Sequence, residues 1–341
     1  MKRYAAILVT ALLLSSCTPA PAAGPALTRA PAPAGESLQL RTTATQLAPF
    51  FAESPSPLPG VFVRKGDRLD YAHRGQHTHV LAGAQSLALA IQGDKALVTD
   101  GAGLFWYDWT AGALTEIPGL PAARFAARSG SSYVLLAEKQ VLVWTPGEDP
   151  VELPLPEQLY GISGAAISPD GQYAAVAFDL DLPYGPRVGV AWAYDLQTGG
   201  ITRWPAGDPQ GQYGLWLLGW SGPHTLRFRI GVRGYDHGYT WELPDRIPDQ
   251  GDSTDYSMPL GAWPNAAGTW LAYQPESDAV AIQSVDPTAK PIYVYKGDAR
   301  PYNARILLNG HLAFLTMSPK AWWEVLPDGT LRRWDECDGL F

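Results

Sequence analysis

Short apolar runs separated by tight polar turns recur along the chain from about residue 60 onward. The clearest unit reads AAISPDGQYAAVAFDL (165–180), followed by VGVAWAYDLQTGGITRW (188–204). This pattern predicts a first strand, a turn at the Pro-Asp-Gly of 169–171, buried strands over 173–178 and 188–194, and a short fourth strand. The unit is therefore expected to form a four-stranded antiparallel sheet.

Similar turn signals recur at intervals of roughly 37 to 52 residues, the period expected for the blades of a β-propeller. They stand at Gly93-Asp94, Gly130-Ser131, Gly222-Pro223, Ala267-Gly268 and Asn309-Gly310. A shorter unit over 61–83, turning at Gly66-Asp67, predicts only three strands. We therefore expect an all-β fold, a β-propeller over 57–341 with six full four-stranded blades plus a partial three-stranded N-terminal unit, which makes six or seven blades. A β-sandwich built from the same hairpins is the alternative.

One stretch of this repeat is similar to a known family. The residues ISPDGQYAAVAF…YDLQTGGITRW resemble the TolB-type and WD-like propeller repeat, and GWSGPHTL (219–226) resembles it less closely. The resemblance implies a propeller fold. It implies no activity, because this fold hosts both enzymes and scaffolds.

The N-terminus carries a different pattern, a basic start followed by an apolar run over 5–14 and then Leu14-Ser15-Ser16-Cys17. It resembles a bacterial lipoprotein signal peptide, which implies cleavage of residues 1–16 and acylation of Cys17, for example by palmitate. The apolar run of about ten residues is shorter than the roughly 20 that span a bilayer. An ordinary secretory signal is the alternative. Residues 17–56 begin with a Pro/Ala-rich stretch and are expected to form a lipidated, semi-extended tether.

Composition and charge exclude several classes of function. The formal net charge is −8, and removal of Lys2 and Arg3 with the signal would make it −10. The sequence contains no basic cluster, so binding to nucleic acid is not expected. With Cys17 acylated, Cys337 would be the only other cysteine, and we expect a half-exposed thiol whose pKa is raised by the neighbouring carboxylates.

Two long polar segments on neighbouring predicted blades, 179–187 and 231–238, are expected to be loops that converge on one face. Their Tyr and Arg content is typical of recognition surfaces, and solvated insertions are the bland alternative. The candidate binding residues are Asp179, Asp181, Tyr184, Arg187, Arg233, Tyr235, Asp236 and His237.

A second cluster contains His73, His77 and His79, three of the six histidines. Together with Asp70 these imidazoles could hold zinc or copper. A polar edge hairpin explains the same residues without metal.

These observations favour a non-enzymatic, lipid-anchored propeller of the bacterial cell envelope, periplasmic or on the outer surface, which binds a protein or glycan partner. The alternatives are an envelope hydrolase or lyase that uses loop carboxylates and His237, and a metal-binding envelope protein. No catalytic or cofactor motif is recognisable, and no cofactor is expected.

Overall fold

The computed structural model describes residues 38–157, 159–180, 188–204, 215–220, 222–232, 235–243, 263–265, 269–284 and 289–341. At 188, 216, 218, 229–232 and 235–238 it describes the backbone alone. All the sheets belong to the compact unit Gln39–Phe341. Within the described residues, no helix is both long and apolar enough to cross a membrane.

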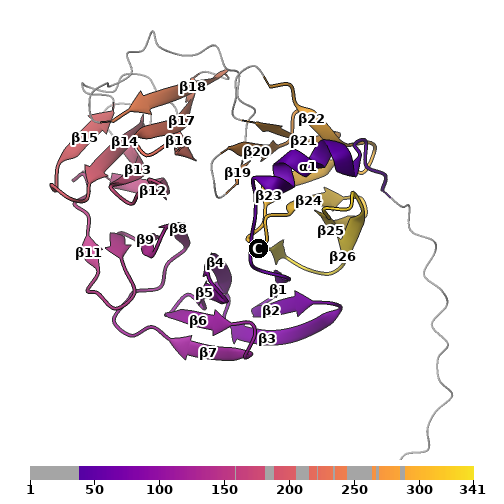
Figure 1. Ribbon diagram of the computed structural model, residues 1–341, viewed down its shortest axis with the longest axis horizontal. Helices are drawn as coiled ribbons and strands as arrows, with labels where there is room; N and C mark the ends of the chain where they lie inside the picture. The colour runs from indigo at the N-terminus through magenta and orange to yellow at the C-terminus, as the bar shows by residue number, and fades with distance from the viewer. Residues whose placement is uncertain are drawn as a thin grey trace, which may run out of the picture. The chain divides into compact units, whose positions relative to one another are not determined.

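The described strands form seven antiparallel sheets, here called blades 1 to 7, which follow one another around a common centre (Figure 1). Blade 1 contains β27 (Gly339–Leu340), β1 (Val61–Lys65), β2 (Arg68–His73) and β3 (Gln76–Ala82). Blade 2 contains β4 (Leu87–Gln92), β5 (Lys95–Thr99), β6 (Leu104–Asp108) and β7 (Ala113–Glu116). Blade 3 contains β8 (Phe125–Ser129), β9 (Ser132–Leu136), β10 (Val141–Trp144) and β11 (Val151–Glu152).

The remaining blades repeat this order, with the first strand innermost and the last strand outermost in the ring. Blade 4 contains β12 (Leu159–Ile167), β13 (Tyr173–Leu180), β14 (Val188–Asp195) and β15 (Ile201–Trp204). Blade 5 contains, within the described residues, β16 (Leu215–Trp220), β17 (Thr225–Val232) and β18 (Tyr235–Glu242). Blade 6 contains β19 (Trp263–Pro264), β20 (Trp270–Tyr273), β21 (Ala279–Ser284) and β22 (Ile292–Lys296). Blade 7 contains β23 (Pro301–Ile306), β24 (Leu312–Met317), β25 (Lys320–Val325) and β26 (Leu331–Trp334).

The turn at 169–171 shows how local sequence sets a hairpin. Gly171 has φ of 74°, a left-handed conformation that glycine adopts without steric cost. The Asp170 carboxylate accepts hydrogen bonds from Ser168 Oγ (2.6 Å) and the Gln172 amide (3.1 Å). The Tyr173 amide in turn donates to Ser168 Oγ at 2.9 Å. These bonds satisfy the turn and start β13, so the hairpin predicted from the repeat is confirmed.

Blade 1 explains why the first unit of the sequence looked short. Its innermost strand is β27, which comes from the C-terminal end of the described chain and pairs with β1 through Val63↔Leu340 and Arg64↔Gly339. The turn at 66–67 therefore joins the second and third strands of blade 1, whereas the other predicted turns within the described residues join first and second strands. The three-stranded N-terminal unit is confirmed, and β27 completes it.

The seam between blades 7 and 1 is held by more than this pairing. The Phe62 and Phe341 backbones exchange hydrogen bonds of 2.9 and 3.2 Å. The Arg305 guanidinium lies 4.4 Å from the ring centroid of Trp322 and 5.0 Å from that of Phe341. Burial lowers the pKa of Arg305 to about 10. Two aromatic rings thus hold a largely buried cation at the point where the ring closes.

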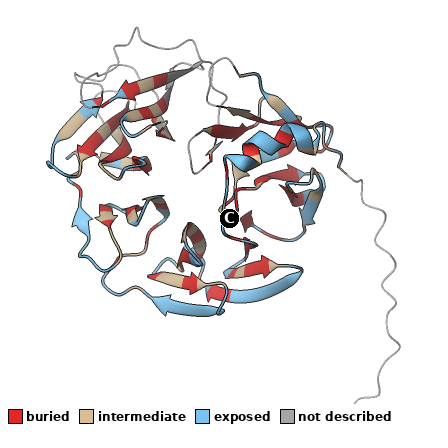
Figure 2. Cartoon of the chain, viewed as in Figure 1, coloured by how far each residue is buried: buried red, intermediate tan, exposed pale blue. Residues whose placement is uncertain are grey.

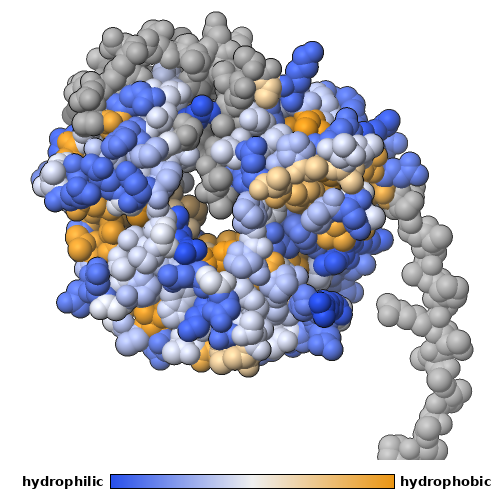
Figure 3. Space-filling model, viewed as in Figure 1, coloured by the Kyte–Doolittle hydropathy of each residue, from blue (hydrophilic) through white to orange (hydrophobic). Residues whose placement is uncertain are grey.

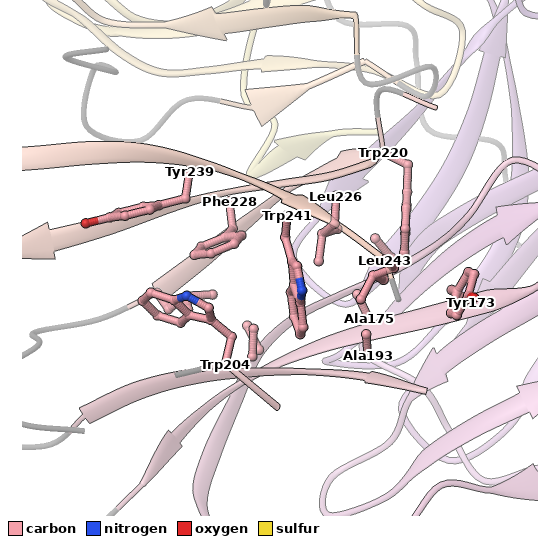
Figure 4. Close-up of a cluster of buried hydrophobic side chains, with 14 residues drawn as sticks. Tyr173, Ala175, Ala193, Trp204, Trp220, Leu226, Phe228, Tyr239, Trp241 and Leu243 are labelled. Atoms are coloured by element: carbon pink, nitrogen blue, oxygen red, sulfur yellow. The ribbon is translucent and has the colours of Figure 1, made fainter. Parts of the chain in front are cut away.

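Neighbouring blades bury aromatic side chains against each other. Between blades 4 and 5, Trp204 and Trp241 are almost fully buried, and the ring centroids of Trp204 and Phe228 lie 4.8 Å apart (Figure 4). Large flat side chains fill the space between twisted sheets. Burial decreases toward the outer edge of the ring, where β7 and β11 are exposed along their whole length (Figure 2).

The helix α1 (Ala44–Ala52) precedes the first blade and packs on the propeller. Thr43 caps it, because the Gln46 amide donates to Thr43 Oγ1 and Gln46 Oε1 accepts from the Thr43 amide at 3.0 Å. Leu47 and Phe50 are fully buried. The expected tether through residue 56 is therefore corrected: the packed unit begins at Gln39, not at 57. Burial of apolar residues within 47–51 offsets the conformational entropy that this segment loses on ordering. A segment of Pro and Ala alone could not offset that loss.

Candidate functional site

The topology gives the ring two different faces. The innermost strands of all the blades begin on the same side, because each follows a connection from the preceding blade. That side also carries the turns between second and third strands, and we call it the connection face. The other side carries the turns between first and second strands and between third and fourth strands, and we call it the helix face.

The helix α1 occupies part of the helix face. Asn265 Nδ2, in the first turn of blade 6, donates to the Glu53 carbonyl and to Ser54 Oγ, both at 3.0 Å. Ser56 Oγ donates to the Leu308 carbonyl in the first turn of blade 7 at 2.8 Å. Figure 1 is viewed with α1 in front of β23, and Figure 3 shows the central opening of the ring in the same view. The connection face lies on the opposite side.

A buried polar cluster lies beneath α1 in blade 7. Glu324, whose side chain is almost fully buried, accepts hydrogen bonds from His311 Nδ1 (2.6 Å), Asn309 Nδ2 (3.1 Å) and Trp334 Nε1 (3.0 Å). The Arg332 guanidinium lies 3.4 Å from the second carboxylate oxygen.

Burial alone would raise the pKa of Glu324. The hydrogen bond and charge of His311, then Trp334 and Arg332, outweigh burial and hold that pKa below its ordinary value. Both carboxylate oxygens are engaged, and the Phe51 ring of α1 lies edge-on to the His311 ring at 5.8 Å. The cluster therefore positions the β23–β24 turn under α1, and this arrangement indicates a structural role.

The predicted binding residues are placed only in part. Asp179 is half-buried near the end of β13, opposite Gly189 of β14. Both strands reach the connection face of blade 4. The predicted residues that lie outside those the structure describes are Asp181, Tyr184, Arg187 and Arg233.

The segment 231–238 is not the long loop that the sequence analysis predicts. Gly231 belongs to β17, and the β17–β18 pairing continues through Ile230↔His237, Gly231↔Asp236 and Val232↔Tyr235. The glycines indicated a loop, but pairing along an eight-residue strand outweighs their low strand propensity. Tyr235, Asp236 and His237 thus lie on a strand of blade 5, at the connection face of the blade that adjoins blade 4.

The three histidines of the predicted metal cluster do not share one face of their sheet. Ala72↔His77 and Asp70↔His79 are paired, so His77 and His79 project on the side of Asp70. His79 Nδ1 lies 3.1 Å from Asp70 Oδ1. His73 projects on the other side, where its ring stacks on Tyr71 at 6.4 Å. In the part of the chain that the structure describes, no three His, Cys, Asp or Glu side chains are grouped to hold a metal ion.

Cys337 is buried rather than half-exposed. Burial is the main cause that raises its pKa, to about 11, and the Asp338 charge adds to it. The raised pKa was predicted from the sequence, but from the neighbouring carboxylates alone and not from burial. This thiol is poorly suited to nucleophilic chemistry.

The innermost strands carry a set of exposed aromatic side chains that was not predicted from the sequence. These are Phe125, Tyr160, Trp263 and Tyr302, exposed by 37, 53, 47 and 55%. Each is the first or second residue of β8, β12, β19 or β23. Because the innermost strands all start on the connection face, the four side chains stand near its central opening. We call this set the aromatic rim.

Two residues of the rim stand at irregularities of their strands. Tyr160 lies between the pairs Leu159↔Leu180 and Gly161↔Asp179, where the register shifts. Tyr302 precedes a second shift, and its neighbour Asn303 has a φ of 55°. Bulges of this kind re-aim side chains and are common next to binding sites. Their position at the strand starts, out of the alternation of the core residues, is the sequence signal that could have identified them.

The connection face is rich in carboxylates. Among its described turns and inter-blade connections, the acidic residues are Asp67, Asp100, Glu138, Glu157, Glu276, Asp278, Asp298, Asp335, Glu336 and Asp338. The basic residues of the same segments are Arg124, Lys139 and Arg300. Several carboxylates have local roles, such as Asp338 accepting from the Gly66 amide. Three of these carboxylates pair with cations of neighbouring strands: Glu336 with Lys65, Glu276 with Lys296 and Asp335 with Arg333. The remaining acidic residues still outnumber the three basic ones, so the described turns and connections carry a net negative charge.

Comparison with known proteins supports the fold and goes no further. No protein-family model matches the chain, and no curated protein matches it in sequence. Among solved structures, the tricorn protease is similar over 84% of this chain, with 12% identity and a TM-score of 0.53; the match covers 35% of that chain. TolB from Acinetobacter baumannii is similar over 82% of this chain and 64% of its own, with 14% identity and a TM-score of 0.44. The Cps50 (Swd1) β-propeller domain of Myceliophteria thermophila is similar over 79% of this chain and 96% of its own, with 14% identity and a TM-score of 0.46. The chain thus spans about a third of the tricorn protease chain and under two thirds of the TolB chain. Its fold is an all-β propeller.

Proposed function

We propose that the protein is a lipid-anchored, non-enzymatic β-propeller of the bacterial cell envelope that binds a partner, protein or glycan, through its connection face. The aromatic rim carries this proposal. These Tyr, Trp and Phe side chains stand on separate blades and stay 37 to 55% exposed, and such residues are enriched where proteins bind one another. The helix α1 covers part of the opposite face.

The predicted binding residues of blades 4 and 5 support the same face. Asp179 adjoins Gly161 beside Tyr160 in the blade 4 sheet. Tyr235, Asp236 and His237 stand at the connection-face end of β18. We therefore extend the proposed site from the aromatic rim outward along blades 4 and 5.

The anchor is part of the proposal and has its own test. Cys17→Ser should move the protein from the membrane fraction to the aqueous fraction, or leave it unprocessed, because the acyl chains supply its membrane affinity. Cys337→Ser is the matched control, since it removes the other thiol and should leave fractionation unchanged. Retention of the Cys17→Ser protein on membranes after a high-salt wash would contradict the anchor.

The binding face is tested by cross-linking in intact envelopes, followed by purification and identification of the linked partner. We compare the wild type with a variant carrying Phe125→Ala, Trp263→Ala and Tyr302→Ala. Its recovery of the partner should fall by about tenfold or more, because an aromatic anchor typically contributes about 2 kcal/mol. Leu114→Ala with Val151→Ala is the control, because both residues are exposed on the outermost strands β7 and β11. Equal recovery from both variants and the wild type would place the binding surface elsewhere.

A further inference from the structure

We propose that the aromatic rim recognises a cationic, extended segment of a protein partner, rich in Lys or Arg. This inference rests on the proposed function and names the chemistry of the ligand. It depends on three features of the connection face: the exposed rings, the carboxylate excess, and a lysine of this chain that is held on the same face by a ring and a carboxylate.

The first feature is the chemistry of the exposed rings. The face of an aromatic ring carries a partial negative charge, so it attracts an ammonium or guanidinium group within about 6 Å of its centroid. Trp is the strongest such residue, and Trp263 is half-exposed at the start of β19. Tyr160 and Tyr302 stand at bulges that turn the innermost strand out of its regular alternation. Rings on separate blades suit a ligand that presents several separated cations.

The second feature is the charge of the surrounding face. Carboxylates outnumber cations among the described turns and connections of this face. A negative surface accelerates the approach of a cationic segment and repels anionic polymers. A neutral oligosaccharide would stack on the same rings but gain nothing from the carboxylates. The charge therefore favours a cationic protein segment over a glycan.

The third feature is an internal example of the proposed contact. At the connection-face end of β22, Lys296 Nζ lies 2.6 Å from Glu276 Oε2 and 5.8 Å from the ring centroid of Tyr293. The hydrogen bond to Glu276 raises the pKa of Lys296, so the ammonium form is favoured. One carboxylate and one exposed ring thus hold a lysine on this face. The exposed rings of the aromatic rim can contact a lysine supplied by a partner in the same way.

The test is a binding titration with the full mature chain in detergent micelles. The probe is a fluorescent peptide of repeated Gly-Lys-Ser-Lys units. Its comparators are the same peptide with Glu or Gln in place of Lys, and a neutral chito-oligosaccharide. The Lys peptide should bind most tightly and should weaken as salt rises, because exposed charges are screened over about 10 Å at 0.1 M salt.

Variants separate the rim from general attraction by the acidic surface. Trp263→Ala with Tyr302→Ala should weaken binding of the Lys peptide by about tenfold, since each lost cation–ring contact is worth a few-fold. Trp263→Phe with Tyr302→Phe should restore most of it, and Leu114→Ala with Val151→Ala should leave it unchanged. Equal loss in the Ala and control variants, or no loss in either, would overturn the inference.

The outcomes also separate this inference from the proposed function. Tighter, rim-dependent binding of the oligosaccharide would overturn the cationic ligand and leave the binding face in place. No binding of the Lys peptide, with rim-dependent recovery of the envelope partner, would do the same. Absence of Lys-peptide binding together with rim-independent partner recovery would refute both proposals.

Discussion

Removal of one aromatic side chain from α1 tests whether this helix is part of the propeller unit. Phe50 is fully buried, and its ring centroid lies 5.9 Å from that of Trp270 in blade 6. Phe50→Ala should therefore lower the free energy of unfolding by about 3–5 kcal/mol, the usual range for a buried Phe. This range is an upper bound, because the loss cannot exceed the free energy that docks α1.

The expected change in melting temperature follows from the size of the unit. Unfolding entropy near 60 °C is about 2.1 cal/mol/K per residue, so a unit of about 300 residues gains roughly 0.6 kcal/mol/K. A loss of 3–5 kcal/mol then corresponds to a fall of about 5–8 °C, measured by calorimetry. Amide hydrogen exchange in residues 44–52 should rise in the same variant, because the helix undocks more often.

Thr45→Ala is the matched control, because Thr45 is exposed on the same helix. It should change the melting temperature by less than about 1 °C, since exposed substitutions rarely exceed 0.5 kcal/mol. If Phe50→Ala and Thr45→Ala melt alike and both keep wild-type exchange in α1, the packing of this helix contributes nothing and the reasoning fails. A chain that begins at residue 57 and therefore lacks α1 should likewise have a lower melting temperature than the wild type.

Three further predictions concern buried or strained positions. Because the pKa of Glu324 is lowered in the fold, its carboxylate stabilises the fold above about pH 4.5, and this contribution is lost as the pH falls through the lowered pKa. Glu324→Gln should therefore reduce the free energy of unfolding near pH 7, and urea denaturation should show a weaker loss of stability toward acid pH. An unchanged loss of stability toward acid pH would contradict this. With a pKa of about 11, only about one Cys337 thiol in a thousand is ionised at pH 8. Its reaction with a disulfide reagent should therefore be at least about a hundredfold slower in the native chain than in the unfolded chain. Equal reaction rates would show that the thiol is accessible. A Cβ at Gly310, whose φ is 78°, would collide with the Ser54 carbonyl. Gly66 also has a left-handed φ, but open space surrounds it, so Gly310→Ala should lower the free energy of unfolding by over about 1 kcal/mol more than Gly66→Ala does. Equal losses in the two variants would exclude the contact.

The repeat of turns and apolar runs was sufficient to predict the fold. Each blade is a local hairpin unit whose turn chemistry, as at Asp170 and Gly171, is encoded within a few residues. The role of β27 could not be predicted, because a two-residue strand carries no periodicity of its own. The helix α1 was missed because the Pro/Ala composition of the preceding residues concealed a short amphipathic stretch that becomes stable only by tertiary packing.

The candidate site was harder to predict, because exposure is a property of the assembled ring. Aromatic residues are usually interpreted as core, and Trp204 and Trp241 are indeed buried. Nothing in the residue type distinguishes them from Trp263, whose exposure follows from its position at the start of an innermost strand. The histidine cluster failed for a related reason: a spacing of two keeps His77 and His79 on one side of the sheet, but the register of the hairpin decides where His73 projects.

The pairing of β27 with β1 has a consequence for how the chain reaches its native state. Gly66 and Asp338, which are hydrogen-bonded across this seam, lie 272 residues apart in sequence. During synthesis β1 emerges long before its partner strand β27, so one edge of β1 stays unpaired until the other six blades have been made. An open strand edge is a template for association with other chains, and closure over so many residues is a late, slow step. A holding chaperone should therefore contact the unclosed chain most strongly at Val61–Lys65, and this contact should end when the ring closes.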